Sequence, residues 1–248
     1  HILILALVVS TGLGTLSNAQ VPKKKKDPAT SLYLAANGLF NRKLYGLAVG
    51  EYEKFLAKYG THPKATNVEF GLSLSYFELK KYDKAEPLLT KLAANANAPQ
   101  RDHIHLLLGE SQLKLKKIPQ AEAAFSAGLK LSKPGNVQAF IQKGLLGAQF
   151  EQEKWKEVVA TAKLLANRKD NIGLNAKMLD ARAKYNLKQF KEAEAALVVL
   201  KPMVAKKSYE QEVAYLLAES KRALGDLKGS VIEYEIAARQ TQGEVAGE

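Results

Sequence analysis

Histidine side chains are the first candidates for acid–base chemistry or metal binding, because they ionise near neutral pH and their ring nitrogens bind metals. The sequence contains four of them. His1 lies in a leader segment, and His62 lies in a turn between two helical stretches. His103 and His105 are two residues apart, and side chains at this spacing diverge on a helix. We interpret this pair as solvated residues at a helix start and expect no metal site.

The other residue types that carry out catalysis form no recognisable pattern. Cysteine is absent, which excludes disulfides, thiol nucleophiles and thiolate zinc sites. The motifs HExxH, GxSxG and GxGxxG do not occur, and neither does a phosphate-binding loop. The carboxylates are scattered over faces that we expect to be solvated. The sequence therefore predicts no enzymatic activity and no cofactor.

The composition is that of a folded, helical protein. Its 248 residues are 46% hydrophobic and 25% charged, which excludes a chain that is disordered throughout. The 37 Lys and Arg residues outnumber the 25 Asp and Glu residues, so the net charge is +12 at pH 7. Leu, Ala, Lys and Glu are frequent whereas Gly and Pro are sparse, and this favours helices.

Residues 1–19 have the pattern of a secretory signal. Ile2–Val9 is an unbroken apolar run, and small residues follow at Ser17 and Ala19, the positions that precede a cleavage site. The alternative is a buried first helix, but glycine and polar residues interrupt residues 11–18. The run is also too short to span a bilayer. Since no basic region precedes it, we expect the sequence to begin inside the signal.

Residues 20–28 contain two prolines and four lysines, which predicts an extended basic linker. Asp27 followed by Pro28 suits the start of a helix, with Asp27 as its N-cap. An exported protein is expected, periplasmic or secreted and soluble. Because there is no cysteine to carry a lipid, it is not expected to be a lipoprotein.

The remainder of the chain is one recurring unit. A small residue returns every 35 to 37 positions, with a bulky apolar residue three positions before it. The six pairs are Tyr45/Ala48, Tyr82/Ala85, Ile118/Ala121, Trp155/Val158, Phe190/Ala193 and Leu227/Ser230. Apolar residues in between follow helical spacing, and breakers fall where the copies join. This predicts six helix pairs in residues 29–244, divided at about 29–65, 66–101, 102–138, 139–173, 174–210 and 211–244, with a tail at 245–248.

This pattern resembles the tetratricopeptide repeat (TPR), a helix–turn–helix unit of 34 residues. The family has a Leu-Gly pair, then an alanine, a bulky residue and a proline at fixed positions. In the third copy these positions hold Leu108-Gly109, Ala121, Phe125 and Pro134. The resemblance implies an all-α, right-handed superhelical solenoid of about six repeats, each contacting mainly its neighbours. The longer period here is expected to lengthen the turns between repeats.

In the TPR family, the first helix of each repeat lines a concave groove that receives a partner segment. Carried over by position, the groove candidates mix aromatic residues with Asn, Arg, Lys and Glu, a mixture suited to an extended chain or a helix. They are Tyr33, Asn37, Asn41, Phe70, Phe77, Glu110, Lys114, Lys143, Phe150, Met178, Arg182, Tyr185, Asn186, Tyr215 and Arg222. The alternative for Phe70, Phe77 and Phe150 is that they only pack against adjacent repeats.

Some TPR domains grip a C-terminal carboxylate through a fixed set of Lys, Asn and Arg residues. Here only Asn37 matches that set, while Tyr33 and Gly71 occupy positions that should hold Lys and Asn. Binding of chaperone tails is therefore not expected.

Lysines recur in the turns within the predicted repeats, and these turns project along one edge of a solenoid. We name this set the basic edge. It comprises Lys43, Lys80, Lys81, Lys116, Lys117, Lys154 and Lys188. The simpler interpretation is that cations stabilise the carbonyl ends of helices and keep the edge solvated. The alternative is attraction to an anionic membrane or cell-wall polymer. Nucleic acid is not expected, because aromatic residues and arginines are not interleaved with these lysines.

The first repeat, through residues 52–63, looks like repeats of two bacterial envelope families. One is the Tol–Pal-associated periplasmic TPR protein and the other is the TPR lipoprotein of outer-membrane assembly. The chain lacks the coiled coil of the first and the lipid-bearing cysteine of the second. The resemblance implies a scaffold of the bacterial cell envelope that binds other proteins or peptide segments. The alternative is a surface-binding module that docks through the basic edge.

The last repeat has no polar capping helix, although TPR arrays usually end in one. Three interpretations are open: Ile232, Ile236 and their neighbours stay partly exposed, the chain dimerises through this face, or the sequence is truncated.

Overall fold

The computed structural model describes residues 27–205 and 209–245, and within them the chain forms twelve α-helices and no strand. The helices are α1 Pro28–Asn41, α2 Tyr45–Tyr59, α3 Ala65–Glu78, α4 Tyr82–Ala94, α5 Arg101–Lys114, α6 Ile118–Leu131, α7 Asn136–Glu151, α8 Trp155–Leu165, α9 Asn171–Asn186, α10 Phe190–Val204, α11 Glu210–Ala223 and α12 Leu227–Val245. The all-α prediction is confirmed. The predicted signal and residues 20–26 of the predicted linker lie outside the described residues.

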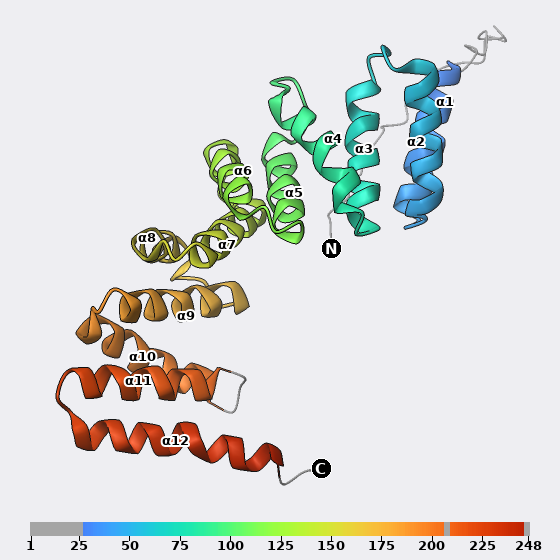
Figure 1. The fold of residues 1–248 in the computed structure, drawn as a ribbon. Helices are drawn as coiled ribbons and strands as arrows, with labels where there is room; N and C mark the ends of the chain where they lie inside the picture. The colour runs from blue at the N-terminus through green and yellow to red at the C-terminus, as the bar shows by residue number, and fades with distance from the viewer. Residues whose placement is uncertain (1–26, 206–208, 246–248) are drawn as a thin grey trace, which may run out of the picture.

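Each helix packs against the next one in the chain, and the pairs stack into a curved array (Figure 1). The odd-numbered helices also contact one another from pair to pair, as α5 contacts α7 and α7 contacts α9. The backbones of successive even-numbered helices do not come this close within the described residues. The layer whose members lie closer together is the inner side of the curve. The odd-numbered helices therefore form the concave face, as expected for a superhelical solenoid.

The first helix begins as the sequence predicts. The carboxylate of Asp27 accepts hydrogen bonds from the backbone N–H groups of Ala29 and Thr30, at 3.2 and 3.0 Å, and Pro28 is the first helical residue. These bonds satisfy N–H groups that have no partner within the helix.

The turn inside each helix pair has one conformation throughout the solenoid. Its key residue adopts a left-handed backbone with φ between 56° and 87°. The six residues are Lys43, Lys80, Lys116, Glu153, Lys188 and Gly225. In the second pair, the N–H of Lys80 donates to the carbonyl of Phe77 and the N–H of Lys81 donates to that of Tyr76, at 2.8 and 2.9 Å. This is a Schellman C-cap, which satisfies the last carbonyls of the first helix.

Because side chains other than glycine disfavour the left-handed region, Lys80→Gly is expected to stabilise the protein by about 0.5–1 kcal/mol. Lys81→Gly is the matched control, since Lys81 has φ −86° and gains nothing from glycine. Urea unfolding followed by circular dichroism compares the two. Equal destabilisation by both substitutions would contradict the strain argument.

Close packing between helix pairs depends on a large ring set between small residues. Phe125 on α6 is fully buried. A Cβ atom added at Gly109 on α5 would lie 2.6 Å from this ring, and one added at Gly144 on α7 would lie 2.4 Å from it. Both distances are well below van der Waals contact. Glycine at these two positions therefore lets α5 and α7 close on the same ring from two sides.

Candidate protein-binding groove

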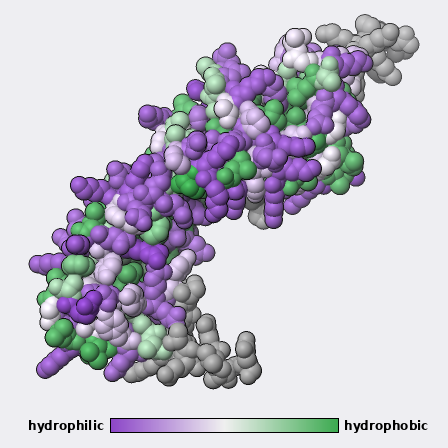
Figure 2. Space-filling model, in the orientation of Figure 1, coloured by the Kyte–Doolittle hydropathy of each residue, from purple (hydrophilic) through white to green (hydrophobic). Residues whose placement is uncertain are grey.

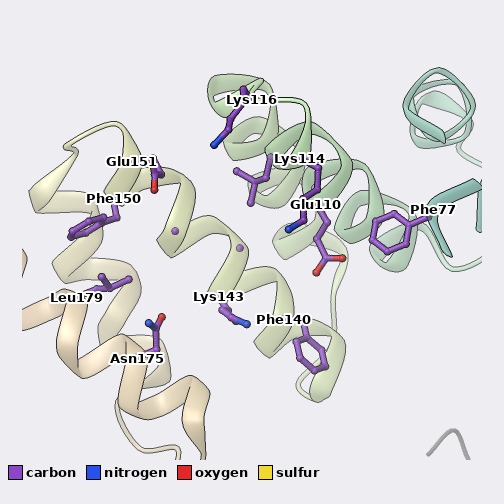
Figure 3. A pocket seen from close by; sticks show the side chains of 13 residues that line it. Phe77, Glu110, Lys114, Lys116, Phe140, Lys143, Phe150, Glu151, Asn175 and Leu179 are labelled. Carbon is purple, nitrogen blue, oxygen red and sulfur yellow. The ribbon is translucent and has the colours of Figure 1, made fainter. Parts of the chain in front are cut away.

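A pocket of about 650 Å³ opens on the concave layer between α5, α7 and α9, with one residue contributed by α3 (Figure 3). Pockets of this size hold several side chains or a drug-sized ligand. It is lined by Phe77, Glu110, Leu113, Lys114, Lys116, Phe140, Lys143, Gly144, Gly147, Phe150, Glu151, Asn175 and Leu179. Side chains from four consecutive repeats thus face one cavity, because the odd-numbered helices stack side by side.

The apolar part of the pocket consists of rings whose positions are fixed by their neighbours. The rings of Phe150 and Trp155 meet edge-on with their centres 5.3 Å apart. The guanidinium of Arg182 lies 5.3 Å from the centre of the Phe150 ring. Phe77 meets Tyr82 in the same way at 5.4 Å. Both phenylalanines are half-buried and remain in the pocket lining. They pack against the second helix of their own pair and also face the groove.

The same contact recurs along the solenoid, always between an aromatic residue near the end of a first helix and one that starts the second helix. The pairs are Phe40–Tyr45, Phe77–Tyr82, Phe150–Trp155 and Tyr185–Phe190, with ring centres 5.3 to 5.7 Å apart. The repeat itself therefore aims an aromatic ring at the concave face.

Charged groups surround this apolar part. Lys114, Lys116 and Lys143 line the pocket, and their ammonium groups form no hydrogen bond or ion pair with any described residue. Burial raises the pKa of Glu110, and the nearby charges of Lys143 and Lys114 oppose this shift. In Figure 3 the side chain of Glu110 lies beside that of Lys114. Three lysines against Glu110 and Glu151 leave the pocket with an excess of positive charge.

Five of the predicted groove residues meet in this pocket. They are Phe77, Glu110, Lys114, Lys143 and Phe150, joined by Lys116 from the basic edge. Sequence reasoning missed Phe140, Asn175 and Leu179 as lining residues. Phe140 is 45% exposed and lies three residues before Lys143, so helical spacing alone carries a signal for it.

The predicted groove residues of the first two repeats lie elsewhere. The hydroxyl of Tyr52 donates to Asn37 Oδ1 at 2.6 Å, so Asn37 is held inside its own repeat. The ring of Tyr33 lies under Lys64, 5.2 Å from its Nζ. Asn41 is exposed at the end of α1. Phe70 is only 8% exposed and packs in the core, so it is not available to a partner.

The predicted residues of the last two repeats also lie outside the pocket. Met178 is 3% exposed and belongs to the core. Arg182 pairs with Glu212 at 3.3 Å, and Asn186 is exposed at the end of α9. The remaining residues gather around Glu219 on α11. Its carboxylate accepts hydrogen bonds from Tyr185 at 3.2 Å, Arg222 at 2.7 Å and Tyr234, whose ring meets that of Tyr215.

The bond from Arg222 is the main reason that the pKa of Glu219 is lowered, with a second contribution from the hydroxyl of Tyr234. Glu219 is therefore ionised, and its carboxylate is already occupied by three hydrogen bonds within the protein. This arrangement holds α9, α11 and α12 together, and it leaves Tyr215 half exposed at the surface.

The basic edge is partly neutralised by the solenoid itself. Lys117 pairs with Glu86 at 2.6 Å and Lys154 pairs with Glu122 at 2.5 Å. In both cases the lysine directly precedes a second helix and the glutamate lies on the second helix of the preceding pair. Lys43, Lys80, Lys81, Lys116 and Lys188 are exposed and have no such partner among the described residues. The edge therefore carries less free charge than the sequence suggests.

One chemical expectation is wrong. His105 does not lie on a solvated helix start, because it is only 9% exposed and its Nδ1 has no hydrogen-bond partner among the described residues. It is covered by α6, where Gly128 approaches its Cβ. Burial lowers the pKa of His105, and the charge of Arg101 lowers it further. His103 is half-buried and meets the ring of Phe70 edge-on.

His105→Leu is therefore expected to stabilise the protein by about 1–2 kcal/mol at pH 8, because it removes a buried polar atom without a partner. The gain should grow as the pH falls to about 5. A histidine whose pKa is lowered in the folded state carries no protonation penalty above the unfolded pKa, and the penalty grows as the pH falls below it, because protonation then favours unfolding. Urea unfolding at both pH values measures this, with Gln112→Leu as the control, because Gln112 is also buried on α5 with an unpartnered oxygen but does not titrate. A gain that shrinks in acid would contradict the burial argument.

Two other properties bear on function. No helix in residues 27–205 or 209–245 combines the length and apolar character needed to cross a bilayer. In the same part of the chain, no group of three His, Asp or Glu side chains is placed to hold a metal ion.

A face of the solenoid is drawn in Figure 2, where hydrophobic residues form small patches between hydrophilic ones. Among the exposed hydrophobic side chains are Leu227, Val231 and Ile232 on α12, each more than half exposed. The sequence predicted exposure of this kind as one of three alternatives for the last repeat. A dimer through this face stays a prediction.

Comparisons with known proteins agree with this architecture. A family model described as tetratricopeptide repeat matches residues 33–102 and 70–136. No curated protein is detectably similar to the chain in sequence.

Several solved structures share its fold. MamA AMB-1 is 19% identical over 73% of this chain and 96% of its own, with a TM-score of 0.59. The C-terminal part of a TPR repeat-containing protein from Cytophaga hutchinsonii is 15% identical over 84% of this chain and 78% of that part, also with a TM-score of 0.59. PilW, described as a type IV pilus biogenesis factor, is 19% identical over 89% of this chain and 94% of its own, with a TM-score of 0.55. Residues 33–136 therefore match the tetratricopeptide repeat family, and the chain as a whole has the fold of a tetratricopeptide solenoid of about six repeats.

Proposed function

We propose that this protein is a non-catalytic scaffold of the bacterial cell envelope that binds a segment of a partner protein in the pocket between α5, α7 and α9. The observation that carries the proposal is the pocket itself. It combines an apolar lining with unpaired charges on the concave layer, as binding sites for protein segments do. TPR proteins generally mediate contacts between proteins, and no catalytic constellation competes with this interpretation in the described residues.

The envelope assignment is supported by the signal pattern of residues 1–19 and by the resemblance of residues 52–63 to envelope TPR proteins. PilW, a pilus biogenesis factor, shares the fold. Fractionation of the native host, followed by N-terminal sequencing of the purified protein, tests export. The expected mature protein begins at Gln20 and leaves the cytoplasm. A protein that retains residues 1–19 in the cytoplasm would contradict the envelope part of the proposal.

Site-specific photo-crosslinking tests the groove. A photo-reactive phenylalanine derivative in place of Leu179 lies in the pocket, whereas the same derivative in place of Lys156 lies on α8, in the outer layer. We expect one or a few discrete crosslinked partners from position 179 and none of these from position 156. Equal products from both positions would mean that partners do not use the groove.

A further inference from the structure

The pocket that carries the proposed function also indicates what kind of segment it binds, and this inference rests on that function. Lys114 ends α5, Lys116 follows in the turn, and Lys143 lies on α7 (Figure 3). The three lysines come from different parts of the chain and face one cavity. None of their ammonium groups lies within ion-pairing distance of a described acidic side chain, although Lys117, next to Lys116 in the chain, pairs with Glu86.

The lysines are not simply the counter-charges of the pocket's own acids. Glu110 and Glu151 supply two negative charges against three positive ones. Neither carboxylate lies within ion-pairing distance of a described lysine or arginine. Burial raises the pKa of Glu110, and the charges of Lys143 and Lys114 offset this shift only in part. A carboxylate from outside would therefore find lysine ammonium groups that are free to pair.

The apolar part of the pocket favours a bound segment that carries a large apolar side chain. Phe77, Phe140 and Phe150 face the cavity, and Gly147 on α7 leaves open space there, since a Cβ atom at this position would meet nothing within 4 Å. A large apolar side chain of a partner can bury its surface on these rings beside Gly147.

We propose that the bound segment is an acidic peptide with at least one large apolar side chain. The apolar side chain enters the pocket beside Gly147, and the flanking Asp or Glu carboxylates pair with Lys114, Lys116 and Lys143. A phosphate-rich polymer fits less well, because it would place its charges next to Glu110 and Glu151 and leave the aromatic rings uncovered.

Selection from a random linear peptide library displayed on phage tests this, with the intact protein immobilised. Peptides retained by the wild type and lost with Gly147→Trp are the pocket-dependent set. We expect this set to be enriched in Asp and Glu next to Phe, Leu, Ile or Trp. A pocket-dependent set without acidic enrichment would overturn the inference and leave the proposed function standing. If no peptide depends on the pocket, both the inference and the proposed function are contradicted.

A synthetic peptide from the enriched set then serves as the probe in fluorescence anisotropy. Lys143→Glu is expected to weaken its binding about tenfold at low salt, with a smaller effect at high salt. Lys116→Glu is compared with Lys43→Glu, since both lysines occupy the same left-handed turn position but only Lys116 lines the pocket. Lys116→Glu should weaken binding and Lys43→Glu should not. Equal effects of the two, or none from Lys143→Glu, would overturn the inference.

Discussion

Gly147→Trp is expected to weaken binding of the partner segment about 100-fold or more and to leave the solenoid folded. Gly147 lies within α7 on the wall of the pocket, and a Cβ atom added there would meet nothing within 4 Å. The indole would occupy the volume that an apolar side chain of the partner needs. Because glycine inside a helix is about 0.5–1 kcal/mol less favourable than alanine, the substitution is not expected to reduce stability.

Titration calorimetry with the crosslinked partner or a selected peptide measures this effect, and circular dichroism confirms the fold. Gly147→Ala is the first control, because a single methyl group leaves most of the pocket empty. Gly38→Trp is the second, since Gly38 also lies in a first helix with open space around its Cβ but is not part of the pocket. Unchanged affinity for Gly147→Trp would show that the partner binds elsewhere on the solenoid.

The arrangement of the helices follows closely from the sequence. The recurring small residues predicted to sit where helices approach are buried in the structure, as Ala85 and Ala121 are. Their spacing carries this information because a solenoid repeats one local contact, and each repeat needs only its neighbours. The handedness and the concave layer then follow from the family resemblance, not from any single residue.

The groove was harder to predict, because a shift of one position along a helix changes the face. On α9 the family positions predict Met178 as a groove residue, but Met178 is buried, whereas Asn175 and Leu179 line the pocket. The face of α9 that lines the pocket holds Asn175 and Leu179, and Arg182 follows on the same face at helical spacing. Family positions were carried over one repeat at a time, and longer repeats make such a transfer inexact.

The environment of His105 could not be predicted for a different reason. The local sequence places it at the start of α5, where a polar residue is usually solvated. Its burial comes from α6, whose Gly128 lets that helix lie close to it. Contacts of this kind depend on where another helix lies, and local polarity carries no information about that.

The two glycines of α7 are also indistinguishable from the sequence, yet the structure predicts opposite effects for them. Gly144→Ala is expected to destabilise the protein by about 2 kcal/mol, after allowing for the better helix propensity of alanine. Its methyl group would lie 2.4 to 2.8 Å from three carbons of the Phe125 ring. The ring has little room to move toward α5, because it packs so closely on Gly109 that a Cβ atom there would lie 2.6 Å from it. Gly147→Ala meets no atom and should be stabilising by about 0.5–1 kcal/mol.

Urea unfolding of both variants measures the difference, and hydrogen exchange of α5, α6 and α7 localises it, since neighbouring repeats open in small cooperative units. The double variant Gly144→Ala with Phe125→Leu separates a steric clash from a general intolerance of alanine. A smaller side chain at position 125 makes room for the methyl group, so the double variant should be more stable than the sum of the two single changes predicts. Additive effects, or equal effects of alanine at 144 and 147, would mean that the contact of Phe125 with Gly144 does not set the spacing of α5 and α7.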